Sequence, residues 1–211
     1  SGVFRLQGGA FPGAPCEFTA MCAFAPYDLQ NVRQIGYDVM SNRPKQAAYR
    51  APGSPMAAYA VESVIDDLCK GLGLDPIDVR LKNASRKGTK ASFGPRFDDI
   101  GLVETLEAAK AHDHYKTPLK DGQGRGISCG FWFNHGGETA VSLALSEDGT
   151  AQISVGTPDI GGSRAGMALM AAETLGVPYE QIRVLVADTD STGYSSTTGG
   201  SRTTFATGLA V

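Results

Sequence analysis

The segment from Ser54 to Gly73 constrains this chain more than any other, because its apolar residues recur at helical spacing. Pro55 suits the first turn of a helix, and Gly71 and Gly73 suit its end. The apolar residues that this spacing places on one side are Ala57, Ala60, Val61, Val64, Ile65, Leu68 and Leu72. The segment therefore predicts a long helix that packs against a core by one face.

Shorter patterns predict the other elements. Asp75-Pro76 is typical of a helix start with an N-cap aspartate, and this helix is expected to run to about residue 83. Helices are also expected over 101–111, 164–176 and 203–211, and an apolar helix or loop over 18–25. Strands are expected over 1–7, 31–40, 126–133, 139–145, 151–155 and 182–187. The turn residues Ser146–Gly149 join two of these strands as a hairpin, which favours an antiparallel meander.

These elements favour an α+β fold in two parts. The N-terminal portion is α/β and carries the long helix, whereas the C-terminal portion has antiparallel strands with packed helices. An exposed loop is expected over 84–100, and residues 116–124 have the composition of a linker. We therefore predict a boundary near residue 120, with parts 1–120 and 121–211. A strand already under way at the first residue and an unfinished helix at the last indicate a fragment.

Composition narrows the classes of partner. The 211 residues are 42% hydrophobic and 19% charged and contain no apolar run of about 18 residues, which argues against a disordered chain and against a membrane partner. The 19 basic and 22 acidic residues give a net charge of -3 without a basic block, which argues against a nucleic-acid partner. A small-molecule ligand is favoured.

The cysteines do not form a metal-binding pattern. Cys16, Cys22, Cys69 and Cys129 include no C-x-x-C motif, and the histidines also lack metal spacing. No metal ligand, iron–sulfur site or catalytic histidine is therefore predicted in this chain. Sparse cysteines favour a reducing, cytoplasmic location, with the periplasm left open for a longer parent protein. A disulfide between Cys16 and Cys22 remains an alternative if the loop between them folds back.

Three loops feed directly into predicted helices and have the composition of anion-binding turns, namely residues 49–55, 161–164 and 199–204. Unpaired N–H groups and the positive end of the helix dipole favour anions there, and Gly, Ser, Thr and Arg add access and donors. Each loop taken alone also fits ordinary helix caps and turns. In a further polar loop, Asp188 and Asp190 favour a turn over a cation site.

Several motifs together resemble one known family. The stretch 46–55 reads QAAYRAPGSP, and AYAVES follows it at 58–63. Later landmarks occur in the family's order, with GTPDIGG at 156–162, ETLGVP at 173–178 and GSR at 200–202. Over nearly its whole length the chain resembles the molybdopterin-binding large subunit of the xanthine dehydrogenase and aldehyde oxidase family. The family's upstream glycine-rich loop and downstream Gly-Glu segment have no counterpart here, so a central fragment is expected.

The resemblance implies roles for individual residues. Those expected near the cofactor are Ala48, Tyr49 and Arg50, and the Arg50 guanidinium is also placed to stabilise developing negative charge. Those expected to face the substrate, together with Arg50, are Pro52, Cys129 and Gly130. Purine-oxidising members carry an aromatic pair at such positions, which this chain lacks. Ala51 replaces a cysteine typical of carbon monoxide dehydrogenases, which disfavours that subclass.

Two further loops are implied to hold the molybdopterin. The first matches a Gly-Gln-Gly loop of the family, without its Gln, and comprises Gly161, Gly162 and Ser163. The second matches the loop that binds the pterin and its phosphate, and its residues are Gly200, Ser201 and Thr203. The family's catalytic base is a glutamate beyond this chain, so no catalytic residue is assigned, and the fragment alone is expected to be inactive.

A molybdenum hydroxylase is the function that the resemblance implies for the parent protein. It would oxidise aldehydes or N-heterocycles with water as the oxygen source, using a molybdenum–molybdopterin cofactor and iron–sulfur and FAD subunits or domains. The alternative is a non-enzymatic anion-binding or interaction domain that retains the fold, which the missing Gln and aromatic pair favour. For Arg50 itself, the alternative is a structural ion pair with Glu62 or Asp66.

Overall fold

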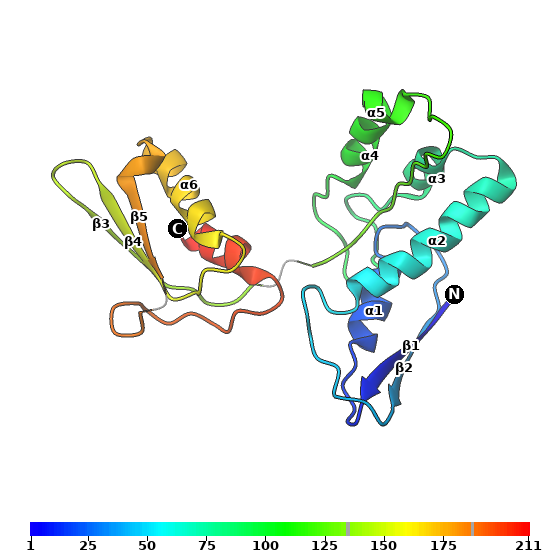
Figure 1. Ribbon diagram of the computed structural model, residues 1–211, viewed down its shortest axis with the longest axis horizontal. Helices are drawn as coiled ribbons and strands as arrows, with labels where there is room; N and C mark the ends of the chain where they lie inside the picture. Colours follow the sequence, from blue (N-terminus) through cyan, green and yellow to red (C-terminus); the bar gives the residue numbers. More distant parts are fainter. Residues whose placement is uncertain (134–135, 187) are drawn as a thin grey trace. The chain divides into compact units, whose positions relative to one another are not determined.

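Two units with separate cores make up the structure. The computed structural model describes residues 1–133, 136–186 and 188–211, and its contacts divide the chain into unit 1, Ser1–Trp132, and unit 2, Phe133–Val211 (Figure 1). Helices and strands both contribute, so the predicted α+β class is confirmed. The assignment of subdomains to 1–120 and 121–211 stays a prediction.

Unit 1 combines a small sheet with five helices. The strands β1 (Gly2–Gly9) and β2 (Gln34–Met40) pair in parallel, with α1 (Cys16–Ala23) between them in the chain. The remaining helices are α2 (Ser54–Leu72), α3 (Pro76–Asn83), α4 (Leu102–Ala111) and α5 (Asp113–Lys116). The strands expected in this part before residue 41 and the helices expected after residue 53 are therefore confirmed.

The long helix α2 begins and ends where its sequence indicates. Gly53 precedes it with a φ of 89°, and Gly73 ends it in the left-handed conformation with a φ of 64°. One side of α2 packs on α1, and Ala57 is fully buried. Its apolar face is wider than this contact, because Val64 and Leu68 remain exposed and line an apolar cavity of about 500 Å3 beside the start of β1.

The loop 84–100 is partly buried, so its expected exposure is wrong. The buried Ser85 donates its hydroxyl to a backbone carbonyl at 2.9 Å, and Ala91 is also buried. A bridge between Lys90 and Arg96 folds the loop back on itself. Because these hydrogen bonds satisfy the polar groups of the loop, it can lie against the rest of unit 1.

No strand forms over residues 126–133, which corrects the strand expected there. The Cys129 N–H donates to the Glu62 carboxylate at 2.8 Å, and the Phe131 carbonyl accepts from the Ser54 hydroxyl at 2.6 Å. Side chains of α2 thus take backbone groups that a neighbouring strand would otherwise pair.

Unit 2 is built on a mixed sheet of order β3-β4-β5. The hairpin strands β3 (Val141–Leu145) and β4 (Ala151–Val155) run antiparallel, as predicted, but β5 (Ile182–Val186) pairs in parallel with β4. The expected antiparallel meander is therefore wrong. The helix α6 (Ser163–Leu175) carries the chain back along the sheet before β5, and such a crossover makes adjacent strands parallel. Ala187, the last residue of the expected strand, lies outside the described residues.

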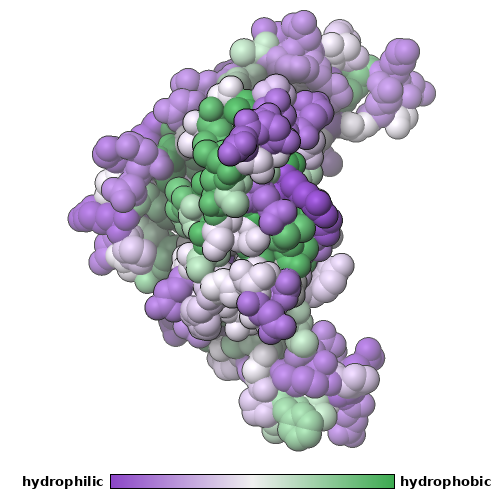
Figure 2. All heavy atoms as spheres, turned by 90° about the vertical axis from the view of Figure 1, so that its left-hand side faces the viewer, coloured by the Kyte–Doolittle hydropathy of each residue, from purple (hydrophilic) through white to green (hydrophobic). Residues whose placement is uncertain are grey.

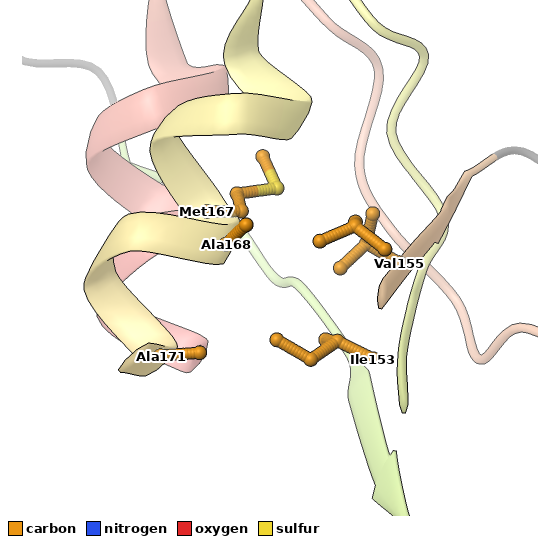
Figure 3. Packing of buried hydrophobic residues seen from close by; sticks show 6 residues of the cluster. Ile153, Val155, Met167, Ala168 and Ala171 are labelled. Atoms are coloured by element: carbon orange, nitrogen blue, oxygen red, sulfur yellow. The ribbon is translucent and has the colours of Figure 1, made fainter. Parts of the chain in front are cut away.

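The helix α6 supplies the core of unit 2. Met167, Ala168 and Ala171 point from α6 toward Ile153 and Val155 of β4 (Figure 3). These two strand residues share one face, because side chains alternate along a strand. The helical and strand patterns of the sequence thus meet in a single core.

The end of the chain forms the expected helix with an irregular first turn. A short helix η1 (Tyr179–Gln181) leads into β5, and a π-helical turn η2 (Thr203–Thr207) continues into α7 (Gly208–Ala210), where Gly208 packs against Met170. On the face shown in Figure 2, hydrophobic surface lies between hydrophilic regions. Among the described helices, none has both the length and the apolar character to cross a membrane.

Candidate functional site

The loop before α2 presents Arg50 on a strained backbone. Ala48, Tyr49 and Arg50 are exposed, and Pro52 is half-buried. Arg50 and Ala51 adopt φ values of 38° and 51°, a region that residues with a side chain rarely occupy. Each such residue costs roughly 1–2 kcal/mol, and strain of this kind concentrates at functional sites. The surroundings of the loop must therefore hold it in this shape.

The structural alternative for Arg50, an ion pair with Glu62 or Asp66, is wrong. Arg80 of α3 occupies both carboxylates, since its Nε donates to Glu62 at 2.9 Å and its Nη2 donates to Asp66 at 2.8 Å. Within the part of the chain that the structure describes, no hydrogen bond or ion pair engages the Arg50 guanidinium. This guanidinium is therefore available to a ligand.

Gly53 seats the same loop on α1 through a contact that only glycine permits. A Cβ at this position would lie 2.6 Å from the Thr19 nitrogen and 2.7 Å from the Pro15 oxygen. At the next position, the Ser54 hydroxyl donates to the Phe131 carbonyl. The end of the loop is thus fixed to two neighbouring segments.

Cys129 and Gly130 lie in the segment that Ser54 and Glu62 hold. The Cys129 side chain is buried, and burial together with the charge of Glu62 raises the pKa of its thiol. A thiolate is thus disfavoured, which fits a lining role and argues against a nucleophile. Gly130 is exposed, and a Cβ there would meet no atom within 4 Å. The surface beside Gly130 is open.

A buried polar network joins these segments. Glu62 accepts from the Tyr27 hydroxyl, from Arg80 and from the Cys129 amide. Burial lowers the pKa of the Arg80 guanidinium, but the hydrogen bonds to Asp66 and Glu62 outweigh burial and raise it overall. Burial and the hydrogen bond to Glu62 raise the pKa of Tyr27. The network therefore contains a protonated Arg80 and a neutral Tyr27 at neutral pH.

In unit 2, the first glycine loop leads into α6. Gly161 and Gly162 have φ values of 61° and 79°, and a Cβ at either position would meet no atom within 4 Å. The Asp159 carboxylate accepts from the Arg164 amide at 3.1 Å and from the Ser163 hydroxyl at 3.4 Å, and it pairs with the Arg164 guanidinium. The loop thus offers a ligand its glycine backbone, whereas the polar side chains of Ser163 and Arg164 are engaged within the protein.

The second glycine loop of unit 2 is built around a buried arginine. Gly200 and Ser201 have φ values of 66° and 61°, and the buried Thr203 begins η2. The buried guanidinium of Arg202 donates to acceptors of Gly136, Gly137, Glu138, Thr139 and Ser196. Arg202 therefore supports the loop and does not provide the free donor that its sequence position suggests.

The meeting of all three loops around one ligand stays a prediction. Within unit 2, Gly162 and Ser201 line separate cavities of about 280 and 540 Å3. The loop that carries Arg50 belongs to unit 1, where it is described by itself.

Other sequence-based alternatives are decided locally. The Asp188 carboxylate accepts from a neighbouring serine at 2.8 Å and from the Asp190 amide at 3.1 Å, and these bonds lower its pKa, so the predicted turn is confirmed. Cys16 and Cys22 are unpaired, because α1 is a helix and separates them by about 9 Å along its axis. The alternative disulfide is therefore wrong. His135, for which no catalytic role is predicted, lies outside the described residues.

The residues that build the site escaped the sequence prediction. Glu62 and Arg80 are 18 positions apart, and a charged residue beside the buried Val61 was the one available hint that Glu62 lies inside. Ser54 and Arg202 reach partners 63 to 77 positions away. No local pattern marks such pairs.

Comparisons with known proteins agree on one family. Models of the molybdopterin cofactor-binding domain match residues 4–84 and 101–211. The chain is 32% identical over 181 residues to the xanthine dehydrogenase molybdenum-binding subunit of Escherichia coli O157:H7, covering 78% of this chain and 24% of the relative. It is 30% identical over 225 residues to the aldehyde oxidoreductase of Megalodesulfovibrio gigas, covering 99% and 23%. The chain thus spans about a quarter of these relatives' length.

Solved structures share the fold. The aldehyde oxidoreductase from Desulfovibrio desulfuricans ATCC 27774 superposes with a TM-score of 0.75 at 25% identity, over 97% of this chain and 24% of that one. Quinoline 2-oxidoreductase from Pseudomonas putida 86 has a TM-score of 0.78 at 18% identity, over 98% of this chain and 31% of that one. Since the match at 101–211 alone covers more than half of the residues, the chain belongs to the molybdopterin cofactor-binding domain family.

Proposed function

We propose that this chain is a central part of the large subunit of a molybdenum hydroxylase. The parent protein oxidises aldehydes or N-heterocycles with water as the oxygen source and passes the electrons to iron–sulfur and FAD subunits or domains. The names of the relatives support this proposal, since they include a xanthine dehydrogenase subunit, an aldehyde oxidoreductase and the nicotinate dehydrogenase large molybdopterin subunit of Eubacterium barkeri.

The glycine loops of unit 2 fit a molybdopterin cofactor. The space beside Gly161 and Gly162 is open, and α6 adds the positive end of the dipole of a 13-residue helix. Gly200, Ser201 and Thr203 would bind the phosphate by backbone and hydroxyl donors. When bound, this cofactor supplies the two-electron oxidation chemistry. The residues of the chain hold it and orient the substrate.

Arg50 is the observation that carries the proposal. Its guanidinium is exposed and unpaired within the described chain, on a loop whose strained backbone is held by Gly53. A planar guanidinium can bind a substrate oxygen or ring nitrogen through two donors, and it stabilises negative charge that develops there. The buried Cys129 and the open surface at Gly130 shape the wall of the same pocket.

The substitution Arg50→Lys in the full-length parent tests this role. Lysine keeps the charge but loses the planar fork, so kcat is expected to fall at least about tenfold, which is about 1.4 kcal/mol, while the molybdenum content stays near that of the wild type. Arg43→Lys makes the same change at another exposed arginine and is expected to leave kcat unchanged. Equal kcat values for the two variants would remove Arg50 from the site.

Metal analysis of the wild-type parent separates the enzyme from the alternative. Molybdenum in the purified protein together with dye-coupled turnover supports the hydroxylase. A parent with neither would favour the non-enzymatic anion-binding domain, which the missing Gln and the Asp159 carboxylate at the end of α6 would then explain. The 211-residue chain alone is expected to give no turnover, because the family's base lies outside it.

A further inference from the structure

We infer that Ser54 and Glu62 of α2 are positioning residues, which together set the main chain of Cys129–Phe131 relative to the Arg50 loop. The inference rests on the proposed function for the statement that this segment forms a substrate wall. The two hydrogen bonds that carry it are features of unit 1 itself.

The segment is held at two points on either side of a glycine. The Glu62 carboxylate accepts the Cys129 amide at 2.8 Å, and the Ser54 hydroxyl donates to the Phe131 carbonyl at 2.6 Å. Gly130, between them, has the widest conformational freedom of any residue type. No neighbouring strand pairs with residues 126–133, so these two bonds replace the restraint that a sheet would give. Without them the wall at Gly130 has few other hydrogen bonds to fix it.

Both holding groups belong to one rigid element. Ser54 and Glu62 are eight positions apart on α2, which corresponds to about 12 Å along the helix axis. Three residues of extended chain span about 10 Å, so Cys129–Phe131 can run beside the first two turns of α2. The Arg50 loop ends at the same helix terminus. One helix therefore sets the spacing between the arginine and the wall.

The surroundings keep Glu62 and Phe131 in place. Arg80, fully buried, donates to the same Glu62 oxygen that accepts the Cys129 amide. Hydrogen bonds to a charged carboxylate are roughly twice as strong as neutral ones, and burial excludes competing water. The Phe131 ring packs against Phe93 and Phe97 with centroid distances of 5.7 Å. The two bonds are thus anchored at both ends.

Ser54→Ala in the full-length parent tests the inference through a split between KM and kcat. The variant is expected to raise KM at least about fivefold, which is about 1 kcal/mol at 1.4 kcal/mol per tenfold, with kcat per molybdenum within about twofold of the wild type. Ser54→Thr keeps the hydroxyl and is expected to restore KM. Ser63→Ala is the matched control, because the Ser63 hydroxyl bonds only to the Tyr59 carbonyl of its own helix.

Amide hydrogen exchange of peptides covering 127–132 gives a readout that does not require activity. Exchange is expected to be at least about fivefold faster in Ser54→Ala than in Ser63→Ala, and faster still in Glu62→Gln, where one amide oxygen must serve two donors. A wild-type parent without molybdenum or turnover would end the proposed function, while the exchange result would still decide the two-point restraint. Equal exchange in the two serine variants would overturn the inference. Faster exchange with unchanged KM would also overturn it and leave a structural role.

Discussion

Replacing Gly53 with alanine should unfold unit 1 far more readily than the same change at Gly73. Both glycines flank α2 and have positive φ values, 89° and 64°. They differ in what surrounds them. A Cβ at Gly73 would meet no atom within 4 Å, whereas one at Gly53 would lie 2.5 to 2.7 Å from atoms of Thr19 and Pro15. The pair separates backbone strain from steric overlap.

The structure gives the expected size of each effect. Left-handed backbone costs an alanine roughly 1–2 kcal/mol at either position. At Gly53 the methyl group also overlaps the first turn of α1, where the Thr19 amide donates to the Pro15 carbonyl at 2.9 Å. Overpacking of this kind costs about 1–3 kcal/mol more. We therefore expect Gly53→Ala to lower the free energy of unfolding by about 2–5 kcal/mol and Gly73→Ala by about 1–2 kcal/mol.

Urea unfolding followed by tryptophan fluorescence measures this difference. Trp132 is the single tryptophan, and its ring lies 6.0 Å from that of Phe18 in α1, so its emission reports on the helix that Gly53 contacts. With an m value of about 1–3 kcal/mol per M, a loss of about 3 kcal/mol shifts the midpoint by at least about 1 M. Midpoints for the two variants that agree within about 0.2 M would refute the steric argument.

Two other substitutions test buried groups. Arg202→Met leaves five buried acceptors without their donor and should destabilise unit 2 by at least about 3 kcal/mol, seen as faster amide exchange over residues 195–203, whereas Arg164→Met breaks one half-exposed ion pair and should change exchange little. Burial and the hydrogen bond to Asp75 raise the pKa of Tyr115 to about 12, above the ordinary value of about 10. The folded state therefore retains this proton more strongly, and the resulting stability is present below about pH 10 and is lost as the pH rises toward 12. Tyr115→Phe should flatten that part of the pH profile of the urea midpoint, and an unchanged profile would contradict the assigned shift.

The helices of this chain follow from local sequence. At α3, the Asp75 side chain accepts from the amides of Ile77 and Asp78 at 2.8 and 2.9 Å, which is the cap that Asp75-Pro76 predicts. The αL glycine at position 73 ends α2 in the same predictable way. Caps and helical spacing act over four residues or fewer, so the sequence displays them directly.

The sheets and the site depend on contacts that are distant in the chain. Residues 126–133 have the composition of a strand, yet their backbone groups bind Ser54 and Glu62 instead of a neighbouring strand. The direction of β5 is likewise set by the crossover through α6, which strand composition does not encode.

The roles of the arginines show the same division. The sequence by itself determined where Arg50 stands, because Pro52, Gly53 and Pro55 make its loop stiff before a helix. Only the tertiary structure decided that Arg80 takes the carboxylates of Glu62 and Asp66, which leaves Arg50 unpaired within the described chain, and that Arg202 is buried on backbone carbonyls. The physical reason is that a guanidinium binds whichever acceptors the fold brings within about 3 Å. Those acceptors lie 14 to 66 residues away along the chain.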